Sequence, residues 1–502
     1  MMGPQVPVHE MLGHWAAVHP DKDFIYHHGG SYTYSDVEGL SLGFSSFLSC
    51  HGVGGGDVVA IMLPRVPELV AAFVGACRTG ALPAPVNYLL GEAGVAEFLE
   101  RASPKVIVTS GKLSGLLPDG ATGKSLVVVI EGNMAGAIPW ERAVEGVYDA
   151  RLGVSDPSEV CYLNYTTGST GNPKGALATH SNIYWNTASC VEAFGMTRED
   201  VHLCMFASFA HPHELFARAL WTGGSLALLE EISPKAISGM ISKRNVTCVM
   251  GLSPMYRMME ESISGRKFAS LRVAESGGML TDPGINKGFM KRFGIPVLSV
   301  WGSTETTGVA LANTPSAYRT DGSIGRPCPG YEVAVIGEGS DDVDNGGVGE
   351  LAVRGGGVVG GYLESGGGTA DGWWRTGDLV RRGGDGYYHF VERRSGMIKS
   401  AGLKVYPTQI ELALCAHPAV SAAAVVPVED RLRGQVPAAF VELRADSVAG
   451  AEEISEFLRG RLAAYMIPRR LDIVDRLPRI GSGKIDKRGV VRTFVKPLEA
   501  AG

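Results

Sequence analysis

The chain has 502 residues, a length that indicates more than one domain. Of these residues 45% are hydrophobic and 20% are charged, which is the composition of a folded protein. Its 46 basic and 52 acidic residues give a net charge of −6, so no overall positive field is present to attract nucleic acid or an anionic membrane. Eight cysteines without a Cys-x-x-Cys pair indicate neither a cysteine zinc site nor a disulfide framework. With no secretion signal and no long apolar run, we expect a cytoplasmic protein without nucleic-acid partners or stable membrane association.

From residue 58 onward, short β-rich runs alternate with helical segments. VVAIMLP (58–64) precedes PELVAAFVGACRTG (67–80), and KVIVTS and SLVVVIEG follow. This alternation predicts an α/β fold with buried parallel strands. Polar loops come directly after four later strands, and the carboxyl ends of such strands are where open α/β sheets bind ligands. The sequence therefore predicts a site at one edge of the sheet.

The texture changes after residue 325, where glycine-punctuated strands predict a β-rich subdomain. Beyond residue 394, strands and helices alternate again in short segments. We therefore expect two domains. The large N-terminal domain, residues 1–393, would contain α/β subdomains and the β-rich subdomain, and a small mobile C-terminal α/β domain would cover residues 394–502.

The segment YTTGSTGNPKG, residues 165–175, combines hydroxyl side chains, glycines and one lysine just after a strand. Glycines let successive backbone N–H groups face one concavity, while the hydroxyls and the lysine add donors, which suits a triphosphate. It is not a Walker A loop, because Gly175 follows Lys174. The candidate phosphate-binding residues are Thr166, Thr167, Ser169, Thr170 and Lys174.

This loop resembles the phosphate loop of the adenylate-forming superfamily, which includes acyl- and aryl-CoA ligases, nonribosomal-peptide adenylation domains and luciferases. Six further motifs occur in the family order: SGGML (276–280), WGSTETTG (301–308), GSIGRPCPG (322–330), WWRTGDL (373–379), RRSGMIKSAGLKVYPTQIE (393–411) and GSGKIDK (481–487). The resemblance implies the adenylate-forming enzyme fold and a reaction in which ATP activates a carboxylate and AMP is released.

The resemblance also implies roles for residues of the large domain. Glu305 would bind Mg²⁺, a hard cation that prefers carboxylate oxygens, and Thr304 would hydrogen-bond a phosphate. Trp301 would stack on adenine, with the Gly277–Gly278 pair as the other wall of that pocket. Thr304, Glu305 and Lys484 are the expected catalytic residues.

Three charged residues near the domain boundary and the C-terminus complete the expected ATP site. By resemblance, Asp378 would accept hydrogen bonds from the ribose hydroxyls, and Arg393 would make a second ribose or phosphate contact. Lys484 would stabilise the charge that builds between the carboxylate and the α-phosphate. Ser395 and Gly396 stand where the family usually has an acidic or lysine hinge.

The second half-reaction implies coenzyme A as acceptor. In the family the small domain rotates, and the loop around Ser400 and Gly402 would then line a pantetheine tunnel. Glycine at 402 suits a narrow passage.

We expect the acyl pocket to accommodate acids larger than acetate, because Gly302 lies where acetate-specific relatives carry a bulky residue. His211 would line or gate this pocket, with Gly251 and Gly308 as further candidates. Amino-acid-activating relatives have an aspartate in the stretch that here reads Ala210 to His213. The absence of a carboxylate from these four positions argues against an α-amino acid substrate.

The leading interpretation is an AMP-forming ligase that uses ATP, Mg²⁺ and CoA on an aryl or medium-chain carboxylic acid. One alternative is a stand-alone enzyme that loads an acyl group onto a separate carrier protein. A luciferase-like oxygenase is another. A catalytically dead nucleotide-binding protein is disfavoured, because all five charged candidates are present: Lys174, Glu305, Asp378, Arg393 and Lys484.

Overall fold

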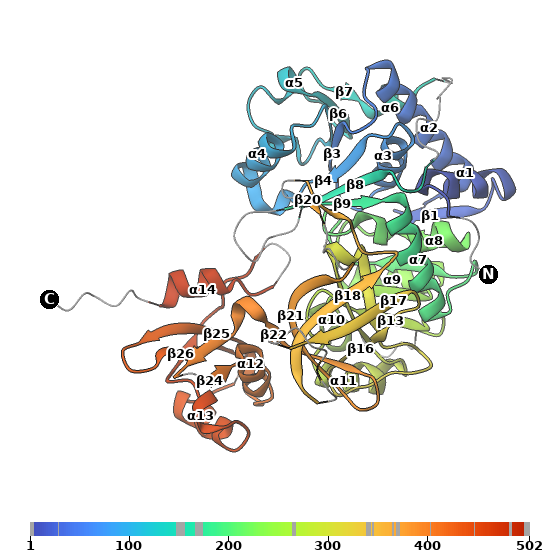
Figure 1. The fold of residues 1–502 in the computed structure, drawn as a ribbon. Helices are drawn as coiled ribbons and strands as arrows, with labels where there is room; N and C mark the ends of the chain where they lie inside the picture. The colour runs from blue at the N-terminus through green and yellow to red at the C-terminus, as the bar shows by residue number, and fades with distance from the viewer. Residues whose placement is uncertain are drawn as a thin grey trace. The chain divides into compact units, whose positions relative to one another are not determined.

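A computed structural model of the chain divides it into two compact units (Figure 1). Unit 1 contains residues 1–333 and 353–374, and unit 2 contains residues 334–352 and 375–502. The structure describes all residues except 1–4, 29, 147–155, 166–173, 264–267, 338–342, 344–345, 364–365, 368–371, 402, 446, 481–483 and 496–502.

One sheet of unit 1 has five parallel strands in the order β4-β3-β5-β6-β7. Its central strands are continuous runs of Val, Ile and Ala, which is typical of strands buried on both faces. The bounds are β3 (Val58–Met62), β4 (Leu82–Pro85), β5 (Val106–Ser110), β6 (Leu126–Ile130) and β7 (Ile138–Pro139).

A larger sheet of unit 1 runs in the order β16-β15-β14-β13-β12-β10-β11-β1-β2. The strands from β14 to β1 are parallel, whereas β15, β16 and β2 are antiparallel to their neighbours. The bounds are β1 (Asp23–His27), β2 (Gly30–Thr33), β10 (Val201–Cys204), β11 (Ser225–Ala227), β12 (Cys248–Gly251), β13 (Val273–Ser276), β14 (Leu298–Ser303), β15 (Gly308–Ala312) and β16 (Ser323–Pro327).

A third sheet joins segments that are far apart in the sequence. It has the order β20-β19-β9-β8, with β8 (Val160–Tyr165), β9 (Gly175–Thr179), β19 (Gly361–Tyr362) and β20 (Gly366–Gly367). The residues between β8 and β9 are the predicted phosphate loop. Two further strands, β17 (Tyr331–Ile336) and β18 (Val348–Gly355), each have residues in both units.

The helices of unit 1 start and end at recognisable signals. Thr33 and Asp36 form a capping box on α2, and Thr179 and Asn182 form one on α7. Gly195 ends α7 in the left-handed conformation, with φ 57°. The α-helices are α1 (Val8–Val18), α2 (Tyr34–Cys50), α3 (Pro67–Arg78), α4 (Gly91–Ala102), α5 (Ala121–Lys124), α6 (Trp140–Val144), α7 (His180–Phe194), α8 (Ala217–Thr222), α9 (Pro234–Arg244), α10 (Ser253–Ser262) and α11 (Pro283–Phe293).

Unit 2 is built around the long antiparallel pair β25 (Val420–Asp430) and β26 (Gly434–Leu443). A buried apolar core lies between this pair and its helices and includes Ile410, Val425, Val441 and Ile454. The other elements are β21 (Trp374–Arg382), which begins one residue before the unit boundary, β22 (Tyr388–Arg393), β23 (Ile398–Ser400), β24 (Leu403–Val405), β27 (Arg470–Val474), α12 (Pro407–Cys415), α13 (Ala451–Arg459) and α14 (Lys487–Phe494).

The predicted fold class is confirmed, since a large α/β part precedes a smaller α/β part. The compact unit that holds the C-terminus begins earlier than the expected domain, because the β21–β22 hairpin and residues 334–352 group with it. The domain boundary at residues 393/394 stays a prediction. No helix among the described residues is both long and apolar enough to cross a membrane.

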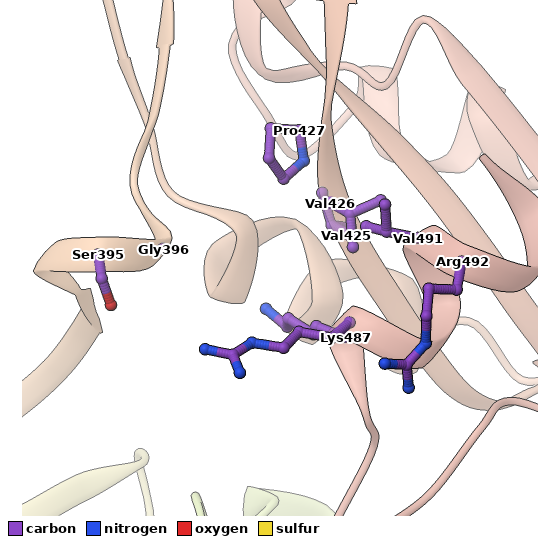
Figure 2. A pocket seen from close by; sticks show the side chains of 9 residues that line it. Ser395, Gly396, Val425, Val426, Pro427, Lys487, Val491 and Arg492 are labelled. Atoms are coloured by element: carbon purple, nitrogen blue, oxygen red, sulfur yellow. The ribbon is translucent and has the colours of Figure 1, made fainter. Parts of the chain in front are cut away.

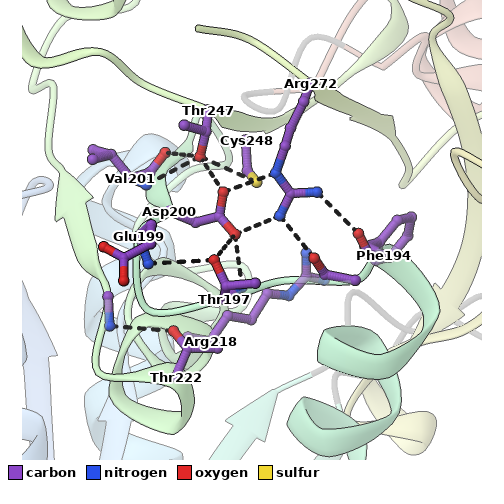
Figure 3. Close-up of polar contacts among 12 residues, drawn as sticks. Phe194, Thr197, Glu199, Asp200, Val201, Arg218, Thr222, Thr247, Cys248 and Arg272 are labelled. Carbon is purple, nitrogen blue, oxygen red and sulfur yellow. Dashed lines mark hydrogen bonds and ion pairs between the residues drawn. The ribbon is translucent and has the colours of Figure 1, made fainter.

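An ion pair between a buried aspartate and a partly exposed arginine fixes the amino ends of three neighbouring strands of the large sheet (Figure 3). Asp200, Thr247 and Arg272 stand just before β10, β12 and β13. Arg272 pairs with Asp200 and donates hydrogen bonds to the carbonyls of Phe194 (3.2 Å) and Gly195 (3.0 Å) at the end of α7. Thr247 donates to Asp200 Oδ1 at 2.7 Å. Burial alone would raise the pKa of Asp200, but the bonds from Arg272, Thr247 and the Thr197 backbone lower it to about 2.

Asp200→Asn should therefore destabilise unit 1. We expect a loss of about 2–3 kcal/mol, less than for a fully buried pair, because the Arg272 side chain is 37% exposed and stays partly hydrated. The lowered pKa also means that the wild-type advantage is present above pH 4 and is lost as the pH falls toward 2. Urea unfolding of both proteins at pH 7 and at pH 3 measures this. Glu199→Gln, next to Asp200 and 77% exposed, is the control, and an equal effect of both variants would contradict the assignment.

The cysteines differ in their exposure to solvent. Six of the eight cysteines are buried, Cys415 is half-buried and Cys50 is exposed. Burial raises the pKa of Cys204, Cys248 and Cys328 to about 12.

Candidate active site

The turn after β14 carries two of the predicted catalytic residues, Thr304 and Glu305. Residues Thr304–Thr306 form a 3-10 turn that Ser303 caps, since its side chain accepts a hydrogen bond from the Thr306 N–H at 3.3 Å. Thr306 Oγ1 in turn donates to the carbonyl of Gly308 at 2.7 Å. Thr307 (φ 54°) and Gly308 (φ 120°) both have positive φ, so the chain reverses sharply into β15.

Buried side chains from three other segments hold this turn. The side-chain amide of Asn186 in α7 donates to the carbonyls of Thr306 (3.3 Å) and Val309 (2.9 Å). The Tyr331 hydroxyl donates to the same Thr306 carbonyl at 2.8 Å. His213 Nε2 donates to the Thr307 carbonyl at 2.9 Å. Burial lowers the pKa of His213 to about 4, so the ring is neutral near pH 7. Sequence reasoning missed Asn186 and Tyr331, because no motif marks them.

A tyrosine links the predicted phosphate-loop lysine to the predicted metal ligand. In the third sheet, Tyr362 of β19 pairs with Ala176 of β9, two residues after Lys174. The Tyr362 hydroxyl donates to Glu305 Oε1 at 2.5 Å, and Lys174 Nζ lies 5.1 Å from the centre of the Tyr362 ring. The backbone is tied as well, because Val359 N–H donates to the Glu305 carbonyl at 2.9 Å. Glu305 is thus held in place, and its carboxylate is the ligand chemistry that Mg²⁺ prefers.

Tyr362→Phe should slow adenylate formation by about tenfold and raise the Mg²⁺ concentration needed for half-maximal rate. The change keeps the ring near Lys174 but removes one hydrogen bond to a charged carboxylate, and such bonds contribute about 1.5–3 kcal/mol. Pyrophosphate exchange over a Mg²⁺ series measures both effects. Tyr318→Phe, at an exposed position, is the control. An unchanged Mg²⁺ dependence in Tyr362→Phe would contradict the role of the Tyr362 hydroxyl in orienting the predicted metal ligand Glu305.

The glycines of the predicted adenine pocket follow β13 and allow close packing. A Cβ added to Gly277 would lie 2.8 Å from Val300 Cγ2, and Gly278 has a φ of 72°. Trp301 lies in β14, next to β13 in the sheet, and is 8% exposed. These positions adjoin the carboxyl ends of neighbouring parallel strands, where the sequence places the site.

The loop that carries His211 is fixed at several points. Asn164 donates to the Ala210 carbonyl at 3.0 Å, and Arg65 donates to the Phe206 carbonyl at 2.9 Å. The rings of His211 and His213 are 6.0 Å apart. Near the end of β12, a Cβ on Gly251 would meet the flexible Met205 side chain at 2.6 Å.

Gly302 has a tight environment. A Cβ added there would lie 2.1 Å from the Gly308 carbonyl oxygen and 2.8 Å from Val309 Cα. The glycine therefore permits close approach of β14 and β15, and a side chain at this position would first meet backbone. Its expected place in the acyl pocket stays a prediction.

Sequence reasoning passed over Glu214, the residue after His213. Glu214 is buried and lies 3.0 Å from Arg218, which also pairs with Glu275 at 2.6 Å. Burial raises the pKa of Glu275, with Arg218 acting in the opposite direction. Glu214 thus already has a cationic partner, and the expected exclusion of α-amino acid substrates stays a prediction.

Unit 2 brings Asp378, Arg393 and Lys484 together. Asp378 of β21 is paired in register with Arg393 of β22, and Arg393 Nε lies 2.7 Å from Asp378 Oδ1. Burial lowers the pKa of Lys484, and the charge of Arg393 lowers it further, whereas Asp378 raises it. Three of the predicted ATP-site residues are therefore electrostatic neighbours.

The predicted hinge borders a cavity of about 420 Å³ in unit 2. Figure 2 shows Ser395 and Gly396 on one side of this cavity and Arg492 of α14 on the opposite side, with Lys487 between them and Val425, Val426 and Pro427 of β25 above it. Just before the hinge, Glu392 accepts hydrogen bonds from the Thr408 backbone N–H (2.8 Å) and hydroxyl (2.9 Å) at the start of α12. Any rotation about residues 394–396 would have to break these two bonds.

Some predicted residues lie outside the described part of the chain: Thr166, Thr167, Ser169, Thr170 and Gly402. Ser400 is buried in β23 and pairs with Gly434 of β26. The predicted site residues fall into one group in unit 1 and another in unit 2.

The chain matches two families along its length: AMP-binding enzyme over residues 12–363 and AMP-binding enzyme C-terminal domain over residues 409–484. A feruloyl-CoA synthase from Amycolatopsis sp is 32% identical, covering 96% of this chain and 99% of the relative. An indoleacetate–CoA ligase from Aromatoleum aromaticum is 28% identical, covering 96% and 97%. The crystal structure of a benzoate CoA ligase from Burkholderia xenovorans LB400 has a TM-score of 0.86 at 26% identity, covering 96% and 99%. The chain belongs to the AMP-binding enzyme family, as its motifs predicted.

Proposed function

We propose that this protein activates an aromatic or medium-chain carboxylic acid larger than acetate as its acyl-AMP and transfers the acyl group to the thiol of coenzyme A. It is an AMP-forming acyl- or aryl-CoA ligase, the class to which its full-length relatives belong. ATP and CoA are its substrates. The observation that most supports the chemistry is the placement of Lys484, which is half-buried and interacts electrostatically with Asp378 and Arg393.

The two half-reactions follow from the leaving groups. A thiol cannot displace oxide from a carboxylate, so the carboxylate first attacks the α-phosphate of ATP and pyrophosphate leaves. The thiol then attacks the acyl-AMP and AMP leaves. In the first step negative charge builds between the carboxylate and the phosphate, and a partly desolvated ammonium stabilises that charge more strongly than one in open water. We assign this role to Lys484.

The other roles follow the predicted set. The hydroxyls of the phosphate loop and Lys174 would hold the triphosphate, and Thr304 would hydrogen-bond a phosphate. Glu305 would bind Mg²⁺, which neutralises phosphate charge, and the Tyr362 hydroxyl orients its carboxylate. Asp378 would bind the ribose. Residues 1–393 and 394–502 would be the two domains that rotate between the half-reactions.

The proposal of an acid larger than acetate rests on the lining of the site. Gly251 adjoins the side chains of Met205 and Met255, which are flexible enough to adapt to a bulky apolar group. Relatives named for feruloyl-CoA and indoleacetate act on aromatic acids, which favours an aromatic ring here.

A panel of carboxylic acids with ATP tests the proposal, with AMP release measured in the presence and absence of CoA. We expect CoA-dependent AMP release that is greatest for aryl or medium-chain acids and low for acetate and for amino acids. AMP release only with an acyl-carrier protein would select the loading enzyme instead. No adenylation of any acid would overturn the assignment of an active ligase.

A further inference from the structure

Three potential metal ligands meet at the carboxyl ends of β1 and β11, two parallel neighbours in the large sheet. His27 is the last residue of β1, His28 follows it, and Glu230 comes three residues after β11. One ligand atom from each side chain lies within 4.8 Å of the other two. His27 Nε2 is 3.5 Å from Glu230 Oε1, and His28 Nε2 contacts the same oxygen.

The His27 ring faces this cluster with its Nε2 atom. Its side chain is 10% exposed, and its Nε2 has no hydrogen-bond partner among the described residues. An imidazole nitrogen in this position, within reach of a second imidazole and a carboxylate, is a ligand that metal ions accept.

The backbone at His28 explains how two consecutive residues reach one point. Successive side chains of a strand point to opposite faces, so His27 and His28 would normally diverge. His28 instead has a φ of 45°, in the turn between β1 and β2, where His27 pairs with Gly30. The two rings consequently lie 4.0 Å apart between centroids.

The third ligand is fixed from behind by a buried arginine. Arg65 is 8% exposed and donates hydrogen bonds to the carbonyls of Glu230 (2.8 Å), Leu229 (2.5 Å) and Phe206 (2.9 Å). Glu230 Oε2 faces Lys112 at 3.9 Å, on the oxygen that the histidines do not contact. The ligand set is therefore largely preorganised.

We propose that His27, His28 and Glu230 bind a divalent transition-metal ion of the zinc type. Two imidazole nitrogens and one carboxylate oxygen are ligands that zinc accepts in a tetrahedral site, with water at the fourth position. A hard ion such as Mg²⁺ prefers oxygen ligands alone and would bind here weakly. The bound ion would join the β1–β2 hairpin to the segment after β11, which Arg65 ties to Phe206 at the start of the His211 loop.

Zinc titration of the metal-stripped full-length protein tests this site. All proteins carry Cys50→Ser, which removes the exposed thiol as a competing ligand. The key variant is His28→Asn, because asparagine tolerates a positive φ and preserves the turn. Glu230→Gln is a second variant that keeps the side-chain shape, and His51→Asn is the matched control at an exposed histidine on another segment.

We expect the parent and His51→Asn to bind one zinc ion that His28→Asn and Glu230→Gln bind at least tenfold more weakly in calorimetry. Zinc should raise the Tm of the parent and the control but not of the two variants. Any change in Tm that Mg²⁺ causes should be the same in all four proteins, because Mg²⁺ should not bind at this site. Identical zinc isotherms and Tm shifts in the parent and both variants would overturn the proposal. Because neither readout involves catalysis, this outcome is independent of the ligase assignment.

Discussion

Lys484→Ala is expected to slow adenylate formation by about 10²- to 10³-fold, the scale of losing one preorganised transition-state donor. The structure adds a reason for an effect of this size, because Lys484 is half-buried and interacts electrostatically with Arg393 and Asp378, so its charge is less screened than in open solvent. Thioester formation from preformed acyl-AMP should continue, since the lysine serves only the first half-reaction. Pyrophosphate exchange and acyl transfer from synthetic acyl-AMP measure the two steps separately.

Lys243→Ala, at an exposed position on α9, is the matched control and should leave both steps unchanged. If Lys484→Ala reduced both half-reactions equally without loss of Tm, the lysine would not be specific to adenylation and its role would have to be reassigned.

Gly302→Ala is the second change with a large expected effect. A single added methyl group would overlap the backbone of Gly308 and Val309, and overpacking of this kind costs about 1–3 kcal/mol. The 303–308 turn would have to move and would displace Thr304 and Glu305, and a shift of about 1 Å in such groups can cost about 10²-fold in rate. We expect a lower Tm and slower adenylation, with the ranking of acid substrates unchanged.

Gly239→Ala in α9 is the control, because a Cβ there meets nothing within 4 Å and alanine favours the helix. The opposite pattern, a stable Gly302→Ala that prefers shorter acids, would show that residue 302 faces the acyl group as the family resemblance implies.

Much of the fold could be predicted from local patterns. The continuous Val, Ile and Ala runs of β3, β5 and β6 predicted buried parallel strands, and the polar loops after β12, β13 and β14 predicted the edge that carries the site. The boundary between unit 1 and unit 2 could not be predicted from such local patterns. Glu392 binds the start of α12 through Thr408, so the strand before the expected boundary packs with the segment after it.

Site residues that lie within a motif could be predicted from the sequence. Residues that reach the site from distant segments could not. WGSTETTG predicted Thr304 and Glu305 as site residues, but their support comes from Asn186, His213 and Tyr331 on three other segments. Tyr362 reaches Glu305 only because β19 pairs with β9, which places Tyr362 opposite Ala176 although 185 residues separate them in the sequence. The effect of a side chain at Gly302 likewise depends on β15, which the motif alone does not place.

The burial of the cysteines determines how the enzyme can be assayed. Consumption of CoA is conveniently followed with a disulfide reagent that reacts with free thiols, and only thiolates react quickly with it. Buried thiols whose pKa is about 12, as for Cys204, Cys248 and Cys328, stay protonated at assay pH. The folded enzyme should therefore contribute a small constant background, chiefly from Cys50, while an unfolded fraction would reveal itself as a slow additional release of colour.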